Sequence, residues 1–132
     1  MSHEQEVFFV FNRVCEILKM RGFIFRPMNR RIHAVKNIRR RYTLGHTNLK
    51  TKVVTVDMYT AKRRQPKKVS AILAIIAHEL AHHQKPPFRQ RYRGRWINRI
   101  HYPAFYRHVK RDMEKLKKDD VLGEYFGSAV SE

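Results

Sequence analysis

The stretch AILAIIAHELAHH, residues Ala71–His83, is strongly apolar and ends in an H-E-x-x-H motif. Its apolar residues recur at helical spacing, and Pro86 and Pro87 follow shortly afterwards. Because proline cannot continue a helix, we expect a buried helix over roughly Lys67–Gln84. Residues four apart lie on the same helix face, so the pattern predicts that His78 and His82 point the same way.

This motif predicts a metal site. Two imidazoles at this spacing can bind one zinc ion, and Glu79 is placed to take a proton from a zinc-bound water. Burying two histidines and a glutamate without partners is costly, which argues against the simpler interpretation that the histidines are only hydrogen-bonded. We therefore expect one Zn²⁺ as the cofactor.

A catalytic zinc ion needs three protein ligands and an open position for water, and the motif supplies two of them. The residue types and their order in the chain leave four candidates for the third ligand: His101, His108, Asp112 and Glu114. His101 precedes Pro103 at the junction of a loop and a helix, where a side chain can be directed back at the motif helix. From the residues alone, all four candidates remain open.

The charge of the chain predicts a polyanionic partner. Lys and Arg number 29 against 11 Asp and Glu, which gives a net charge of +18 over 132 residues. Between Lys19 and Arg111 the acidic residues are Asp57 and Glu79. Such a field favours DNA, although a solvated basic surface or an anionic membrane would share the charge. The expected nucleic-acid-binding residues are Arg39, Arg40, Arg41, Lys62, Arg63, Arg64, Arg91, Arg93, Arg95 and Trp96.

Nothing in the sequence predicts a membrane segment. No apolar run is long enough to cross a bilayer, and the first residues lack the basic start of a signal peptide. The single Cys15 cannot form an internal disulfide, which is compatible with a reducing compartment. We therefore expect a cytoplasmic or nucleoid-associated protein that does not bind membranes.

The remaining segments predict an α+β fold with an N-terminal helix, a small three- to four-stranded sheet, the motif helix and a C-terminal helix. We expect a single domain over residues 1–118 and a weakly ordered tail over 119–132. The expected elements are a helix over Ser2–Arg21 capped by Gly22, strands over Phe23–Arg26, Ile32–Ile38, Tyr42–Leu44 and Val53–Asp57, a turn at Gly45–Asn48, a basic loop over Lys85–Arg99 and a helix over Pro103–Lys118.

The order of Leu44-Gly45, Val53–Asp57, the H-E-x-x-H helix and His101-x-x-x-Phe105 resembles the SprT-like metalloprotease domain. That family includes the Spartan protease, which degrades proteins crosslinked to DNA. The resemblance covers about Phe23–Lys118 and implies a minimal zincin-like domain. The chain has no C-x-x-C pair, so the C-terminal zinc ribbon of many relatives is absent. By resemblance, His78, His82 and His101 would be the zinc ligands and Glu79 the general base.

These observations predict a zinc-dependent endopeptidase that acts on proteins bound or crosslinked to DNA. Tyr102, Tyr106, His83 and His108 are candidates for stabilising the oxyanion. Two alternatives remain. One is a nucleic-acid-binding protein with a structural zinc site, for which His83 or His108 would be a fourth ligand. The other is a zinc hydrolase with a different substrate.

Overall fold

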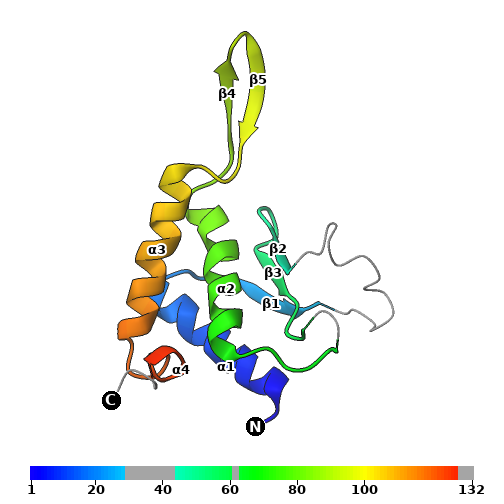
Figure 1. Ribbon diagram of the computed structural model, residues 1–132, viewed down its shortest axis with the longest axis vertical. Helices are drawn as coiled ribbons and strands as arrows, with labels where there is room; N and C mark the ends of the chain where they lie inside the picture. Colours follow the sequence, from blue (N-terminus) through cyan, green and yellow to red (C-terminus); the bar gives the residue numbers. More distant parts are fainter. Residues whose placement is uncertain (29–43, 61–62, 128–132) are drawn as a thin grey trace.

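The computed structural model describes residues 1–28, 44–60 and 63–127. This part of the chain has a mixed α+β fold with four helices and two small sheets (Figure 1). The elements, in chain order, are α1 (His3–Leu18), β1 (Ile24–Pro27), β2 (Gly45–Asn48), β3 (Val53–Val56), α2 (Val69–Gln84), β4 (Phe88–Tyr92), β5 (Arg95–Arg99), α3 (Pro103–Lys118) and α4 (Glu124–Gly127).

Helix α1 begins where the sequence predicts and ends earlier. The Ser2 hydroxyl accepts from the Gln5 backbone N–H, and the Gln5 side chain accepts from the Ser2 N–H, so the two residues form a capping box. The prediction that Gly22 caps the C-terminal end of this helix is wrong. The helix closes at Lys19, which adopts a left-handed conformation with φ of 57°, while the Met20 N–H donates to the Cys15 carbonyl.

The larger sheet has the strand order β1-β3-β2, with β1 parallel and β2 antiparallel to β3. The β-branched strand at Val53–Val56 is confirmed. The predicted turn at Gly45–Asn48 is wrong, because this segment pairs with β3 as strand β2. The chain instead reverses direction after Asn48, whose side chain accepts hydrogen bonds from two backbone N–H groups in the turn. The predicted strand at Ile32–Ile38 lies outside the described residues.

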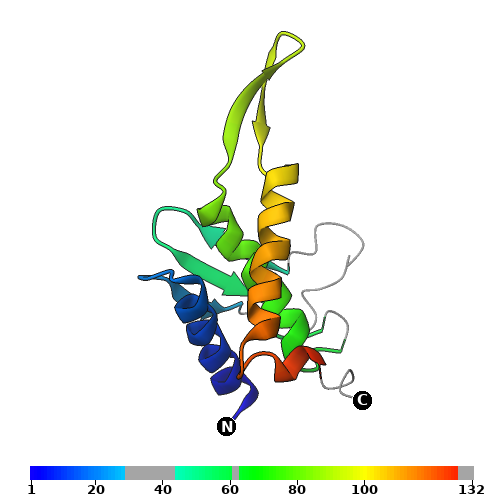
Figure 2. The same cartoon turned by 90° about the vertical axis from the view of Figure 1, so that its left-hand side faces the viewer.

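Helix α2 lies at the centre of the core. It packs against α1 and α3 and against the sheet (Figures 1 and 2). Its fully buried side chains include Ile72, Leu73, Ile76 and Leu80, which form the apolar stripe that the sequence predicts. Burying side chains of this size stabilises the fold by roughly 1.5–3 kcal/mol each, so the core holds the motif helix firmly in place.

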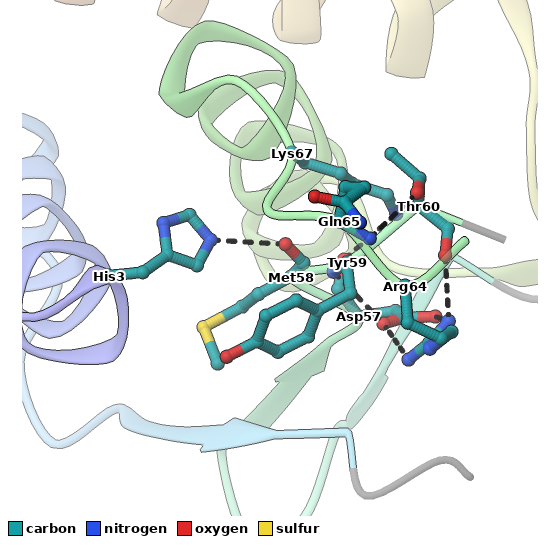
Figure 3. A network of polar contacts seen from close by, with 8 residues as sticks. All are labelled: His3, Asp57, Met58, Tyr59, Thr60, Arg64, Gln65 and Lys67. Atoms are coloured by element: carbon teal, nitrogen blue, oxygen red, sulfur yellow. Dashed lines mark hydrogen bonds and ion pairs between the residues drawn. The ribbon is translucent and has the colours of Figure 1, made fainter. Parts of the chain in front are cut away.

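Polar contacts fix the segment that connects β3 to α2 (Figure 3). The Asp57 carboxylate is fully buried and accepts two hydrogen bonds from the Arg64 guanidinium, at 2.8 and 3.0 Å. The Lys67 ammonium donates to the Asp57 carbonyl at 2.8 Å, and the His3 ring contacts the Met58 carbonyl at 3.1 Å. This network joins the end of the sheet to the entry of α2.

The segment between α2 and α3 is a hairpin and not the irregular loop that the sequence predicts. Strands β4 and β5 pair antiparallel, with Phe88 opposite Arg99 and Tyr92 opposite Arg95. The hairpin extends beyond the ends of α2 and α3, away from the rest of the molecule (Figures 1 and 2).

Helix α3 is confirmed at Pro103–Lys118, and the chain beyond it packs more closely than expected. Leu122 is fully buried, and the Arg13 guanidinium donates two hydrogen bonds to the Asp119 carboxylate, at 2.6 and 3.0 Å. Residues 119–127 are therefore part of the packed domain, in contrast to the weakly ordered tail that we expected from residue 119. No helix in the described ranges is long and apolar enough to cross a membrane.

Candidate metal centre

Three histidines from two parts of the chain meet at one point. His78 and His82 lie one turn apart on α2, and His101 lies two residues after the end of β5. One ring nitrogen from each lies within 4.8 Å of the others, and the Nε2 atoms of His78 and His101 are 3.2 Å apart. These side chains are close enough together to bind a metal ion.

The separation of His78 and His101 matches that of two ligands on one tetrahedral metal ion. Two nitrogens bound at 2.0–2.1 Å with a tetrahedral angle lie about 3.3 Å apart, close to the His78–His101 separation. Burial and the neighbouring imidazoles lower the pKa of His82 to about 4, and burial lowers the pKa of His78. Both rings are therefore neutral at pH 7, which is the form that binds a metal.

Glu79 lies in the same cavity as the three histidines. This cavity has a volume of about 360 Å³ and is lined by Gly45, His46, Thr47, Leu49, His78, Glu79, His82, Pro87, Ile100 and His101. Glu79 is 7% exposed, and burial raises the pKa of its carboxyl group to about 7. A buried carboxyl group beside the histidine cluster is suited to accepting and returning a proton.

Strand β2 forms one wall of the cavity because glycine lets it approach α2 closely. A Cβ atom at Gly45 would lie 2.9 Å from the Ile75 Cγ2 atom, 3.0 Å from the Thr55 carbonyl oxygen and 3.5 Å from the Glu79 Cγ atom. Any side chain at this position would push the strand away from Glu79. Among the described strands β2 pairs with β3 alone, so no other described strand pairs with its second edge.

Phe105 forms the floor beneath the histidines. It is fully buried, and its ring stacks on the His82 ring with centroids 4.5 Å apart. The rings of His78 and His101 lie edge-on to it at 5.1 and 5.3 Å. The His101-x-x-x-Phe105 spacing therefore places the ligand candidate just before α3 and its packing partner in the first turn of α3.

The other candidates for the third ligand lie elsewhere. His108 Nε2 lies 3.6 Å from an Asp112 carboxylate oxygen, in a buried polar cluster between α2 and α3 that also includes Gln84. Burial raises the pKa of Asp112. Glu114 is exposed on α3. Within the described residues, neither these three nor any further His, Cys, Asp or Glu joins the histidine cluster.

His83, considered as a fourth ligand, contacts the sheet. Its Nε2 atom lies 2.6 Å from the Thr47 Oγ1 atom on β2, and its ring packs edge-on against Phe23. This contact positions the cavity wall, and its one signal in the sequence is the unusual histidine directly after the motif.

The two tyrosines proposed for the oxyanion have different surroundings. The Tyr102 hydroxyl donates to the Pro86 carbonyl at 3.0 Å, and its ring contacts Phe88, so it closes the base of the hairpin. Tyr106 is 54% exposed and stacks on His101 with centroids 6.1 Å apart. The oxyanion role of both tyrosines stays a prediction, and Tyr106 has the less constrained hydroxyl in the described contacts.

The expected nucleic-acid-binding residues divide into three groups. Arg91, Arg93, Arg95 and Trp96 all lie on the hairpin, and Arg63 is exposed. The Arg64 side chain is only 12% exposed and forms a buried ion pair with Asp57, so it is a structural residue and not the surface contact we expected. Arg39, Arg40, Arg41 and Lys62 lie outside the described residues.

Comparisons with family models, with curated proteins and with solved structures find no match for this chain.

Proposed function

We propose that the protein is a zinc-dependent endopeptidase that cleaves proteins bound or crosslinked to DNA. The observation that carries this proposal is that three imidazoles, one carboxylate and a strand edge that no other described strand pairs with line a single cavity. Each component has a distinct use in peptide hydrolysis, and a purely structural metal site has no need of the carboxylate or of the strand edge.

His78, His82 and His101 would hold the zinc ion. When bound, the ion supplies Lewis-acid chemistry, which acidifies a water molecule and polarises the scissile carbonyl. Glu79 accepts the proton of the attacking water and later donates it to the leaving amine. Because His101 is exposed, one side of the cluster stays accessible to a polypeptide.

The substrate chain would bind along β2. A second cavity of about 350 Å³ borders the first, and both are lined by Gly45, His78 and Glu79. An extended peptide that pairs with the edge of β2 would therefore pass Glu79 with space on either side. Such main-chain pairing gives affinity with little sequence selectivity. This shape favours a peptide over the small substrate of another type of zinc hydrolase.

The hairpin supports the part of the proposal that the substrate protein is attached to DNA. It lies between α2 and His101 in the chain, so its base is continuous with the metal site. Its arginines would hold DNA beside the cavity, where a protein attached to that DNA reaches the cavity at high local concentration.

The alternative is a DNA-binding protein whose zinc is structural. Structural zinc sites are closed by four protein ligands. Three histidines form the cluster in the described part of the chain, and the two candidates for a fourth, His83 and His108, make other contacts. These contacts support a site with an open position, which is the form that catalysis requires.

Cleavage of a crosslinked substrate tests this function. A small protein would be crosslinked to a fluorescent DNA duplex and incubated with the zinc-loaded chain, beside the same protein without DNA. We expect cleavage of the crosslinked protein, and a loss of about 100-fold or more in rate for Glu79→Gln with zinc content unchanged. Equal cleavage with and without DNA would disprove the DNA-linked part, and full activity of Glu79→Gln would disprove the catalytic part.

A further inference from the structure

The hairpin β4–β5 is an arm that no other helix or strand covers in the described part of the chain. Every residue of β4 is exposed, and within the described residues neither strand packs against another helix or strand. In the described contacts the hairpin is held at its base, where the Tyr102 hydroxyl donates a hydrogen bond to the Pro86 carbonyl. Because an isolated two-stranded hairpin is only marginally stable in water, an arm of this kind is suited to being covered by a bound partner.

Strand register gives the arm two polar, aromatic faces. Residues that are opposite in an antiparallel pair point to the same side. Arg91 is opposite Trp96 and Arg89 is opposite Asn98, which defines the Trp96 face. The other face, called the Tyr92 face, carries Phe88, Gln90, Tyr92, Arg95, Ile97 and Arg99. Each face therefore combines exposed aromatic rings with arginine and amide side chains.

The charge on the arm is entirely positive. Five arginines lie on it, and the sequence contains no Asp or Glu from Leu80 to Arg111. The guanidinium groups of Arg89 and Arg91 lie 5.2 and 5.8 Å from the centre of the Trp96 ring. Those of Arg93 and Arg99 lie 5.1 and 5.8 Å from the centre of the Tyr92 ring. Stacking on aromatic rings holds the guanidinium planes without neutralising them.

We propose that this hairpin enters the major groove of duplex DNA. The major groove of B-form DNA is about 12 Å wide and admits a two-stranded β-ribbon, whose two faces then reach base edges and both phosphate walls. Arginine, glutamine and asparagine, the side chains that bind guanine and adenine edges, alternate along the arm. The major groove of A-form RNA is too narrow for a ribbon, so the shape selects DNA.

This inference rests on the DNA-binding part of the proposed function and is independent of the peptidase part. It adds the element that contacts DNA, the groove that it occupies and the form of nucleic acid that it selects. It also explains the order of the chain, because an arm inserted between α2 and His101 holds the duplex beside the metal site.

The first test is the affinity of the whole chain for a fluorescent DNA duplex, measured by anisotropy over a range of salt concentrations. The variant Arg91→Gln/Arg95→Gln removes two positive charges from the arm. Lys110→Gln/Lys118→Gln removes the same charge from exposed positions on α3 and is the matched control. We expect the arm variant to bind about tenfold or more weaker, with a salt slope smaller by about 1.8, and the control to change less.

The second test identifies the groove. Dimethyl sulfate methylates guanine N7, which lies in the major groove. We expect the wild-type chain and the α3 control to protect guanine N7, and the arm variant not to protect it. Glu79→Gln should protect as the wild type does, because it keeps the arm. This control separates a failure of the groove proposal from a failure of the peptidase proposal.

Three outcomes would overturn the inference: equal loss of affinity in the α3 control, absence of N7 protection by a bound wild-type chain, or equal or tighter binding of single-stranded DNA or duplex RNA of the same sequence. Circular dichroism and urea unfolding of the arm variant establish that a loss of binding is not a loss of folding.

Discussion

His83 Nε2 lies 2.6 Å from Thr47 Oγ1 and thereby ties the C-terminal end of α2 to strand β2. The Thr47 hydroxyl donates to the Val53 carbonyl at 3.2 Å, so its oxygen is left to accept from the His83 ring N–H. This contact joins the residue after the second motif histidine to the strand that lines the metal cavity.

Thr47→Val should loosen this wall without affecting the metal. The substitution keeps the shape of the side chain and leaves the half-buried His83 ring without its partner on β2. We expect the free energy of unfolding in urea to fall by about 1 kcal/mol, with zinc content unchanged. Thr51→Val, in the exposed turn after β2, is the control and should change neither quantity. Loss of zinc in Thr47→Val would contradict the expectation that this contact shapes the wall without affecting the metal.

Gly45→Ala should disturb the cavity by steric contact. The added methyl group would lie 2.9 Å from Ile75 and 3.0 Å from the Thr55 carbonyl oxygen, inside ordinary contact distance. We expect a loss of roughly 1–3 kcal/mol in unfolding free energy and a larger loss of peptidase activity than of zinc binding.

Gly127→Ala is the comparison for this substitution, because no atom lies within 4 Å of a Cβ at that position. It should be close to neutral. Wild-type stability and activity in Gly45→Ala would show that β2 does not need its close approach to α2.

Arg64 and Arg63 should behave differently although they are neighbours in a basic run. Arg64→Ala leaves the fully buried Asp57 carboxylate without its guanidinium and should cost about 3–5 kcal/mol of unfolding free energy. Arg63→Ala removes an exposed charge and should change stability by less than about 0.5 kcal/mol. Equal stability of the two variants in urea would contradict the structural role of Arg64.

Glu79 should make the metal-free protein sensitive to pH. Burial raises the pKa of its carboxyl group from 4.5 to about 7, so between these values the folded chain keeps a proton that the unfolded chain releases. The stability of the metal-free protein therefore falls as pH rises through this window. Above the window the full loss of unfolding free energy is present.

Metal-free Glu79→Gln should lack this pH-dependent loss of unfolding free energy. We expect it to be more stable than metal-free wild type by at most about 3 kcal/mol near pH 8, with the difference disappearing near pH 4. Glu114→Gln, at an exposed position on α3, should show no such pH-dependent gain. Urea unfolding in the presence of a chelator measures both, and a wild-type pH profile in Glu79→Gln would contradict the buried carboxylate.

The elements with strong local patterns were predicted correctly from the sequence. The apolar stripe of α2, the β-branched residues of β3 and Pro103 at the start of α3 each specify an element by themselves. Strand β2 was missed because Gly45 and Asn48 favour turns locally, whereas pairing with β3 and the close approach to α2 decide the structure. Tertiary contacts of this kind have no signal in the local sequence.

The hairpin was missed for a different reason. Both of its faces are exposed, so it lacks the alternation of apolar and polar residues that marks a half-buried strand. Its signal was the Arg93-Gly94 pair, both left-handed, between the aromatic residues Tyr92 and Trp96. Arginine is uncommon in such two-residue turns, so this pair is a weak signal for a hairpin.

The metal site was partly predictable. Helical spacing alone places His78 and His82 together, but the residue types left four candidates for the third ligand. The resemblance to a known family favoured His101, and the fold brings that residue to the cluster by way of the hairpin. The contacts of His83 and of His108 depend on β2 and α3 packing against α2, which no spacing in the sequence specifies.

The most direct test of the account is the zinc content of the purified chain, measured by mass spectrometry for the wild type and for His101→Ala, with His83→Ala and His108→Ala as matched histidine controls. The account predicts one zinc ion per chain in the wild type and in both controls, and most of the zinc lost in His101→Ala. Full zinc in His101→Ala, or loss of zinc in His108→Ala, would contradict the three-histidine site.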